Sequence, residues 1–284
     1  MNKYEYKIIA DSSCELPSKY AADERFAIVP FRMEIDGYPI RDSKNINIKE
    51  LLDRIAKSKS CPRSACPSPD LFLKHFEGSE KRIYIITVSA KLSGCYNSAM
   101  LAKRIYEESH DDKIITVIDS KSASGGECLI ALKALELEEL GLPGKEIQDY
   151  LADYRDHMFT YVVLDNIETL RKNGRLSRLK AIAANSFNIK PLLSGKDGEI
   201  VELGHAVGLR KTWQCMVSKI EQQTAKMADT KNRVLIITHC NNERGAKKVC
   251  EMLKKHTNFK DYIIMNTSGL SSLYANDGGI IVAY

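Results

Sequence analysis

The chain has 284 residues, of which 44% are hydrophobic and 28% are charged, a balance that is typical of globular proteins and excludes a disordered chain. At this length about 74% of the unfolded surface can be buried, and length alone favours about two domains. The net charge of +5, from 42 basic and 37 acidic residues, is small, and the basic residues are interspersed with acidic ones, so we expect no nucleic-acid partner.

The predicted elements begin with an alternation of strands and helices. Apolar runs of strand length and helical spacings of apolar residues follow one another through the first part of the chain. In chain order they predict strands at 4–10 and 26–35, helices at 48–55 and 69–77, a strand at 82–88, a helix at 94–108, a strand at 113–119, and helices at 129–140 and 147–158. This alternation predicts a parallel sheet that is covered by helices on both faces.

The pattern changes after about residue 160, where hairpin signals mix with helices. Asp197-Gly198 is a typical hairpin turn between two strand-like runs within 189–208. The other elements predicted here are strands at 160–165, 233–239, 262–265 and 279–284, a short helix that ends at Gly174, and helices around 213–220 and 243–253. We therefore expect an α/β protein of two domains, residues 1–163 with a parallel sheet and residues 164–284 with a mainly antiparallel sheet.

No apolar run reaches the ~18 residues that a membrane-spanning helix needs. The start of the chain carries an apolar run of only three residues, whereas a secretory signal needs roughly 7–15. We therefore expect a cytoplasmic protein with no membrane span and with reduced cysteines. Three cysteines within apolar helical patterns, Cys128, Cys215 and Cys250, are expected to be buried. Cys61 and Cys66 have no matching second pair, so the spacing predicts no zinc site.

Candidate binding residues follow the strands of the predicted parallel sheet. Ligands of such sheets bind beyond the carboxyl ends of the strands, which here are 11–14, 89–94 and 120–126. These segments lack the glycine-rich signatures of dinucleotide and nucleotide-phosphate binding. Serines at such places ordinarily cap helices. However, Ser93-Gly94 opens a predicted helix directly after a buried strand, where free N–H groups favour a carboxylate or a phosphate.

A second candidate is Gly174-Arg175, in the basic segment 170–177. One interpretation is structural: Gly174 ends a helix in the left-handed conformation, and basic residues favour a helix C-terminus. The other interpretation is functional: Arg175 holds an anion through its planar guanidinium group. The residues alone leave both interpretations open.

A catalytic site finds little support in the residues. The nucleophile elbow Gly-x-Ser-x-Gly is missing around Ser93. His205 and His239 have no partner that the sequence assigns, and His239 and Cys240, as neighbours near a strand end, face opposite sides. The sequence therefore predicts neither a serine or cysteine triad nor a metal site.

Six segments follow one another in order along nearly the whole chain. They are Asp-Ser-Ser-Cys-Glu-Leu at 11–16, Ser-Ala-Cys-Pro-Ser at 64–68, Ser-Ala-Lys-Leu-Ser-Gly-Cys-Tyr-Asn-Ser-Ala at 89–99, Val-Ile-Asp-Ser-Lys at 117–121, the segment 170–177, and Asn-Ile-Lys-Pro at 188–191 followed by Lys-Asp-Gly at 196–198. Together they resemble the motifs of the DegV family of fatty-acid-binding proteins. The segment at 89–99 is close to the family's Ser-Ser-x-Leu-Ser-Gly-Thr-Tyr-Gln-Ser-Ala.

The resemblance implies that two α/β domains enclose one long-chain fatty acid, such as palmitate, without a cofactor and without catalysis by the protein itself. Residues 1–163 would carry the loops around the carboxylate, and residues 164–284 would close over the ligand. Ser64, Ser93 and the N–H of Gly94 would bind the carboxylate, and Arg175 would belong to the same network. A separate fatty-acid kinase is the implied partner, and transient contact with a membrane is a further expectation.

The chain departs from the family pattern beside the expected carboxylate site. Cys66 and Cys95 stand where the family has Gln and Thr, and both lose a polar group. Tyr274 stands in place of the His of a His-x-Gly-Pro-Gly motif. We expect Tyr274 to bind the ligand through one hydrogen bond, without the positive charge of a histidine. The alternative hypothesis is an acyl or phosphoryl transferase that uses the same pocket.

Overall fold

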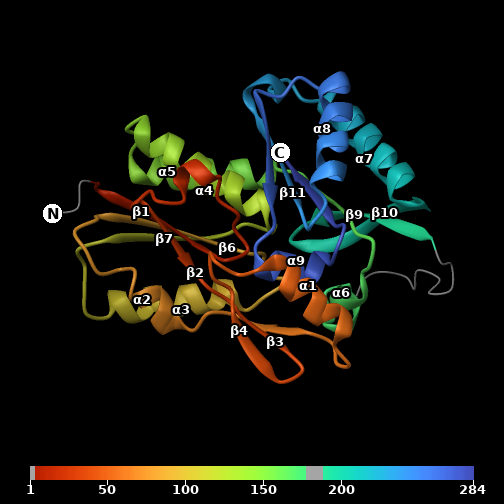
Figure 1. Ribbon diagram of the computed structural model, residues 1–284. Helices are drawn as coiled ribbons and strands as arrows, with labels where there is room; N and C mark the ends of the chain where they lie inside the picture. Colours follow the sequence, from red (N-terminus) through yellow and green to blue (C-terminus); the bar gives the residue numbers. More distant parts are fainter. Residues whose placement is uncertain (1–3, 177–187) are drawn as a thin grey trace.

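The computed structural model describes residues 4–176 and 188–284 of the chain (Figure 1). A parallel sheet in the order β2-β1-β6-β7 lies between two layers of helices. Its strands are β1 (Tyr6–Asp11), β2 (Phe26–Val29), β6 (Arg82–Thr87) and β7 (Ile114–Asp119). The layers are α2 (Pro69–Leu73) with α3 (Cys95–Glu107) on one face, and α4 (Gly125–Glu139) with α5 (Gly144–Asp156) on the other.

Alternation along the strands explains why both faces of this sheet are apolar. In β1, Ile8 packs into the cluster that contains α4, whereas Ile9 packs into the cluster that contains α3. Successive strand residues point to opposite faces, so a continuous apolar run supplies two cores at once. The predicted parallel sheet with helices on both faces is confirmed.

A second sheet of six strands lies beside the first, in the order β10-β9-β8-β13-β11-β12. All its pairs are antiparallel except β11 with β12. Its strands are β8 (Thr160–Val163), β9 (Ile189–Lys196), β10 (Glu199–Val207), β11 (Val234–His239), β12 (Asp261–Asn266) and β13 (Ile280–Ala283), and α7 (Leu209–Thr224) and α8 (Glu243–His256) cover one face. This arrangement confirms the predicted fold class.

Helix α4 joins the two sheets, because it packs against both. Ile236 of β11 and Ala283 of β13 belong to the same apolar cluster as the β1 residues beneath α4. A Cβ on Gly125, the first residue of α4, would lie 2.8 Å from Ile236 Cγ2. A glycine at this position therefore allows the start of α4 to approach the second sheet closely.

The segment 26–35 was predicted as one strand, and this prediction was wrong. β2 pairs with β1, whereas β3 (Arg32–Ile35) belongs to a separate sheet with β4 (Tyr38–Arg41) and β5 (Arg63–Ala65). Pro30 lies between β2 and β3 and has no N–H to donate to a strand partner. The chain leaves the first sheet there. The turn at Asp36-Gly37 that joins β3 to β4 has the positive φ angles of a two-residue hairpin, 50° and 81°.

The hydrogen bonding of strand β8 indicates where the chain can be divided into two domains. Its residues pair with β9 and β13, so 160–163 belong by hydrogen bonding to the second sheet. The division into 1–163 and 164–284 stays a prediction. We propose that the chain has two domains, and the pairing of β8 favours a boundary before Thr160.

Smaller elements fill the space between the sheets. Helix α9 (Gly269–Ala275) lies against α1 (Ile48–Lys57) and α6 (Glu168–Lys172), and their apolar side chains share one cluster. Two short 3₁₀ helices, Ser18–Tyr20 and Thr230–Asn232, complete the described elements. No helix in the described ranges is long and apolar enough to cross a bilayer. Cys128 and Cys250 are buried as predicted, but Cys215 is exposed on α7.

Candidate ligand-binding site

A cavity lies between the carboxyl ends of the parallel strands and the second sheet. It holds about 920 Å³ of space that no atom fills, part of it open to solvent. The loops after β1, β6 and β7 form one wall, and β8, the β9–β10 hairpin, β13 and α9 form the other. Its apolar lining residues are Phe31, Val88, Leu92, Ala123, Val162, Leu164, Leu170, Ile200, Leu270, Ala275 and Ile281. The cavity therefore lies at the strand ends where the sequence predicted a ligand.

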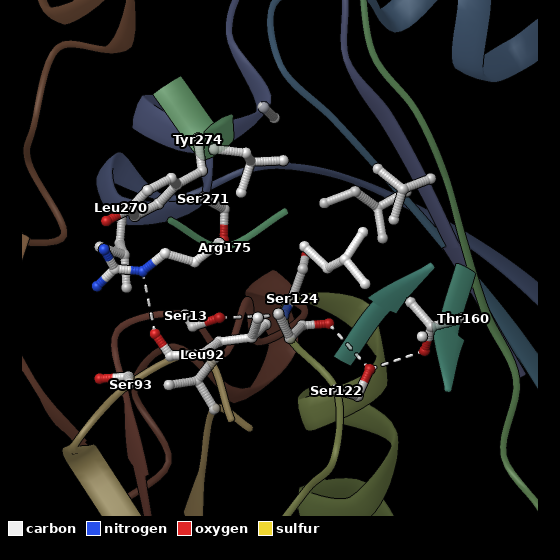
Figure 2. Close-up of a pocket in the computed structure, with 18 of the residues that line it drawn as sticks. Ser13, Leu92, Ser93, Ser122, Ser124, Thr160, Arg175, Leu270, Ser271 and Tyr274 are labelled. Carbon is white, nitrogen blue, oxygen red and sulfur yellow. Dashed lines mark hydrogen bonds between the residues drawn. The ribbon is translucent and has the colours of Figure 1, made fainter. Parts of the chain in front are cut away.

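Four of the five predicted site residues line this cavity: Ser64, Ser93, Arg175 and Tyr274. Ser64 Oγ and the Tyr274 hydroxyl share a hydrogen bond of 2.8 Å, although 210 positions separate the two residues. The Arg175 guanidinium carbon lies 5.8 Å from the centre of the Tyr274 ring. Figure 2 shows the Tyr274 hydroxyl, the Arg175 guanidinium and the Ser93 hydroxyl at one end of the cavity. That end combines hydroxyl donors with a cation.

Ser93 and Gly94 precede α3 and differ in their relation to the cavity. Ser93 Oγ accepts a hydrogen bond of 3.2 Å from the N–H of Cys95. No acceptor among the described residues takes its own hydroxyl hydrogen, so that hydrogen can serve a ligand. Gly94 is not a lining residue, and a Cβ there would lie 3.5 Å from Cys66 Sγ. The role of the Gly94 N–H stays a prediction.

Arg175 is placed by the end of α6. Gly174 has a φ of +75°, its N–H donates to Arg171 O (3.0 Å), and the N–H of Arg175 donates to Leu170 O (2.9 Å). This pair of bonds is a Schellman motif, which needs a left-handed residue at the position of Gly174. The Arg175 side chain then donates from Nε to Leu92 O (3.2 Å) and from Nη1 to Asn173 O. Gly174 thus ends the helix, and the same turn directs Arg175 to the cavity.

Three buried carboxyl groups lie behind the cavity wall: Asp11, Glu15 and Glu127. Burial raises the pKa of Asp11 to about 6 and that of Glu15 to about 7, and it raises the pKa of Glu127 well above its usual range. Glu15 accepts from Ser124 Oγ (2.6 Å) and from the N–H of Ser268 (2.9 Å). Glu15 therefore connects the residue before α4 to the residue before α9.

A fourth carboxylate holds the first turn of α9. Asp42 is 3% exposed and accepts from the N–H groups of Gly269 (3.0 Å) and Leu270 (2.9 Å). Helix α9 carries Leu270 and Tyr274, which line the cavity. Sequence reasoning missed Glu15 and Asp42 as supports of the site, because no local pattern shows which distant N–H groups a carboxylate meets.

His205 and His239, the two histidines weighed as catalytic candidates, do not line the cavity. His205 Nδ1 is 3.1 Å from Glu202 Oε1 on β10, and His239 Nδ1 accepts from the N–H of Asn242 at 3.2 Å. No described residue that lines the cavity is a histidine or a cysteine. Within 4–176 and 188–284, no group of three or more His, Cys, Asp or Glu side chains is arranged to hold a metal ion.

Comparison with known proteins finds relatives over the full length of the chain. The profile of a family described as "Uncharacterised protein, DegV family" matches residues 5–284. A DegV family protein from Ruminococcus gnavus, whose crystal structure was refined with vaccenic acid, is 39% identical, with a TM-score of 0.95 and 100% coverage of both chains. The Streptococcus pneumoniae Fatty Acid Kinase (Fak) B3 protein loaded with linoleic acid is 32% identical, with a TM-score of 0.89 and 98% coverage of each chain. A DegV domain-containing protein from Streptococcus pneumoniae is 33% identical over 283 residues, 98% of either chain.

Proposed function

Because the chain belongs to the DegV family, we propose that it binds one long-chain fatty acid in the cavity and presents the carboxylate to a separate fatty-acid kinase. The observation that carries this proposal is the cavity itself, which has a mainly apolar wall and a polar end built from Ser64, Ser93, Arg175 and Tyr274. Relatives with 39% and 32% identity carry vaccenic acid and linoleic acid, and the second is named after a fatty-acid kinase.

The polar end has hydrogens to offer a carboxylate. Ser64 and Tyr274 share one hydrogen bond, so the second of their two hydroxyl hydrogens is available. Ser93 offers another. The bonds of Arg175 to backbone carbonyls start from Nε and Nη1, so Nη2 can face the ligand. We propose that the Gly94 N–H, at the start of α3, completes this set.

Apolar burial supplies most of the affinity. A 16-carbon acid has about 14 methylene groups, and at ~0.8 kcal/mol each their burial contributes about 11 kcal/mol before the costs of binding. The polar end then orients the carboxylate. A ligand held in this way should survive purification.

We propose a carrier that catalyses nothing itself. An acyl or phosphoryl transferase would need a nucleophile with a nearby base. The described cavity wall contains serines but no histidine; the groups that could act as a base there are Lys121, which is bonded to Asp156, and Glu199. Turnover of an acyl ester or acyl phosphate by the protein alone, lost in a Ser93→Ala variant, would support the transferase instead. Phosphorylation of the bound acid only after addition of a kinase would support the carrier.

Removing both serine hydroxyls should release the fatty acid. Hydrogen bonds to a charged group contribute about 1.5–3 kcal/mol each, so the Ser64→Ala/Ser93→Ala double variant should bind at least about 100-fold more weakly. Native mass spectrometry of the purified protein, followed by organic extraction, should show a mass excess of one fatty acid in the wild type and its loss in the double variant. The exposed Ser218→Ala on α7 is the control and should keep the ligand. A wild type that neither carries nor takes up any fatty acid would overturn the proposal.

A second test of fatty-acid binding uses Gly174, because the turn at Gly174 directs Arg175 to the cavity. Gly174 and Gly141 both have positive φ angles, +75° and +74°, and a Cβ at either would meet no atom within 4 Å. Gly174→Ala and Gly141→Ala should therefore each lower the free energy of unfolding by about 1 kcal/mol, measured by urea titration. Only Gly174→Ala should also weaken fatty-acid binding, because Gly141 lies at the end of α4, outside the cavity wall. Equal affinity in the two variants would contradict the role of Arg175.

A further inference from the structure

Two hydroxyl groups form a second polar place in the cavity wall. Ser122 Oγ and Thr160 Oγ1 share a hydrogen bond of 2.7 Å, and the two residues are only 6% and 8% exposed. Figure 2 shows this pair on the side of the cavity away from Tyr274 and Arg175. Ser122 precedes α4 and Thr160 begins β8, so the pair joins the two walls. A bound acyl chain would meet it along its length and not at its carboxylate.

The fold makes room for this pair. A Cβ on Gly126, in the first turn of α4, would collide with Ser122 Oγ and would lie 3.1 Å from Thr160 Oγ1. A glycine at this position therefore lets both hydroxyls occupy the wall. The charge on the neighbouring Lys121, which also lines the cavity, pairs with Asp156 through a hydrogen bond of 2.6 Å, and Asp156 lines an outer pocket and not the cavity.

Counting hydrogens shows that the pair is not satisfied. If Thr160 donates to Ser122, the Ser122 hydrogen is left with Ala123 O at 3.4 Å, beyond the about 2.5–3.0 Å of a good O–H···O bond. If Ser122 donates to Thr160, the Thr160 hydrogen has no acceptor among the described residues. Either way, one buried hydroxyl hydrogen lacks a good partner. Such a group costs free energy unless an acceptor is placed beside it.

Apolar neighbours make the polar pair selective. Ala123, Val162 and Ile281 line the same cavity and offer no hydrogen-bonding side chain. Ser122 and Thr160 also line the outer pocket, so the wall is one layer of side chains thick at this point. Lys121 lines the cavity next to Ser122, but its ammonium group is bonded to Asp156, so a ligand oxygen at this depth would meet the hydroxyl donor of the pair. A methylene group at the same depth would leave the donor buried against hydrocarbon.

We propose that Ser122 and Thr160 form a subsite for an oxygen atom within the acyl chain, so that the cavity prefers long-chain hydroxy or oxo fatty acids to unsubstituted ones. The inference rests on the proposed fatty-acid binding and adds the class of acyl chain. The ligand oxygen accepts the spare hydroxyl hydrogen, and the carboxylate keeps its place at Ser64, Ser93 and Arg175. One added hydrogen bond of this kind corresponds to a preference of about three- to tenfold.

A competition experiment tests the subsite. Octadecanoic acid is mixed in equal amounts with each of its monohydroxy derivatives, substituted at successive chain positions, and offered to the delipidated full chain. Native mass spectrometry reads the ratio of the two complexes. In the wild type and in Thr160→Ser, at least one hydroxy acid should exceed the unsubstituted acid about three- to tenfold. In the Ser122→Ala/Thr160→Val double variant, which lacks both hydroxyl groups, this ratio should fall to about one.

The controls separate this inference from the proposed function. Ser64→Ala should weaken both acids but keep their ratio, because it acts on the carboxylate they share. If the wild type binds octadecanoic acid and prefers no hydroxy isomer, the subsite is overturned and fatty-acid binding stands. The same holds if a preference persists in the Ser122→Ala/Thr160→Val double variant. If the wild type binds neither acid, both proposals fail.

Discussion

Raising the pH from about 4.5 to about 7.5 should destabilise the wild-type protein by about 3 kcal/mol more than it destabilises a Glu15→Gln variant. Glu15 is buried, and the loss of solvation raises its pKa from 4.5 to about 7. In this range the folded protein keeps a proton on Glu15 that the unfolded chain has released. Stability contributed by that proton is complete below about pH 4.5 and is lost as the pH rises through about 7.

The comparison with Glu15→Gln is needed because other groups titrate nearby. Burial also raises the pKa of Asp11, from 3.8 to about 6. The wild type therefore loses further stability as the pH rises through that lower range. Gln keeps the shape of the Glu15 side chain and a carbonyl oxygen for the N–H of Ser268, but it cannot ionise. The difference between the two proteins therefore isolates the proton on Glu15.

Urea unfolding at a series of pH values measures this difference. The two curves of unfolding free energy against pH should diverge as the pH rises, with the wild type losing more. The exposed Glu146→Gln on α5 removes a carboxyl group without burial and should run parallel to the wild type. Parallel curves for Glu15→Gln and wild type would show that burial does not raise the pKa of Glu15 in the folded protein.

Elements with strong local signals could be predicted from the sequence. The four strands of the first sheet that carry apolar runs, and the hairpin turn at Asp197-Gly198, are where the patterns placed them, except for the break at Pro30. In these cases the same residues that favour the element also bury its face. Local preference and tertiary packing therefore agree.

Parts of the site could not be predicted from local patterns. Ser64 lies on β5, a strand of three residues, and Tyr274 lies on α9, a helix of seven residues. Elements this short are not stable alone and form because distant groups hold them. The resemblance to a family pointed to Ser64 and Tyr274, but their mutual hydrogen bond appears only in the folded chain. The Ser122–Thr160 pair has no sequence signal, because it depends on how β8 lies against the start of α4.

Replacing Asp42 with alanine should be among the most damaging single changes at the site. The variant leaves the buried N–H groups of Gly269 and Leu270 without their acceptor, and each unsatisfied group costs about 1–3 kcal/mol. We expect the free energy of unfolding to fall by about 2–6 kcal/mol in a urea titration. Asp42→Asn is the matched control, because it keeps one of the two acceptor oxygens and should lose about half as much.

The same change should reach the ligand through α9. Without Asp42 the first turn of α9 keeps the two bonds from Ser268 to Glu15 but loses the acceptor of two N–H groups, so Leu270 and Tyr274 are held less firmly in the cavity wall. Fatty-acid affinity should then fall at least about tenfold, and backbone amide exchange should speed up in α9 before it does in α3. Faster exchange spread evenly over both helices would show that Asp42 stabilises the whole protein and does not position α9. Exchange confined to α9 would mean that a carboxylate in the loop after β4 determines where α9 meets the cavity.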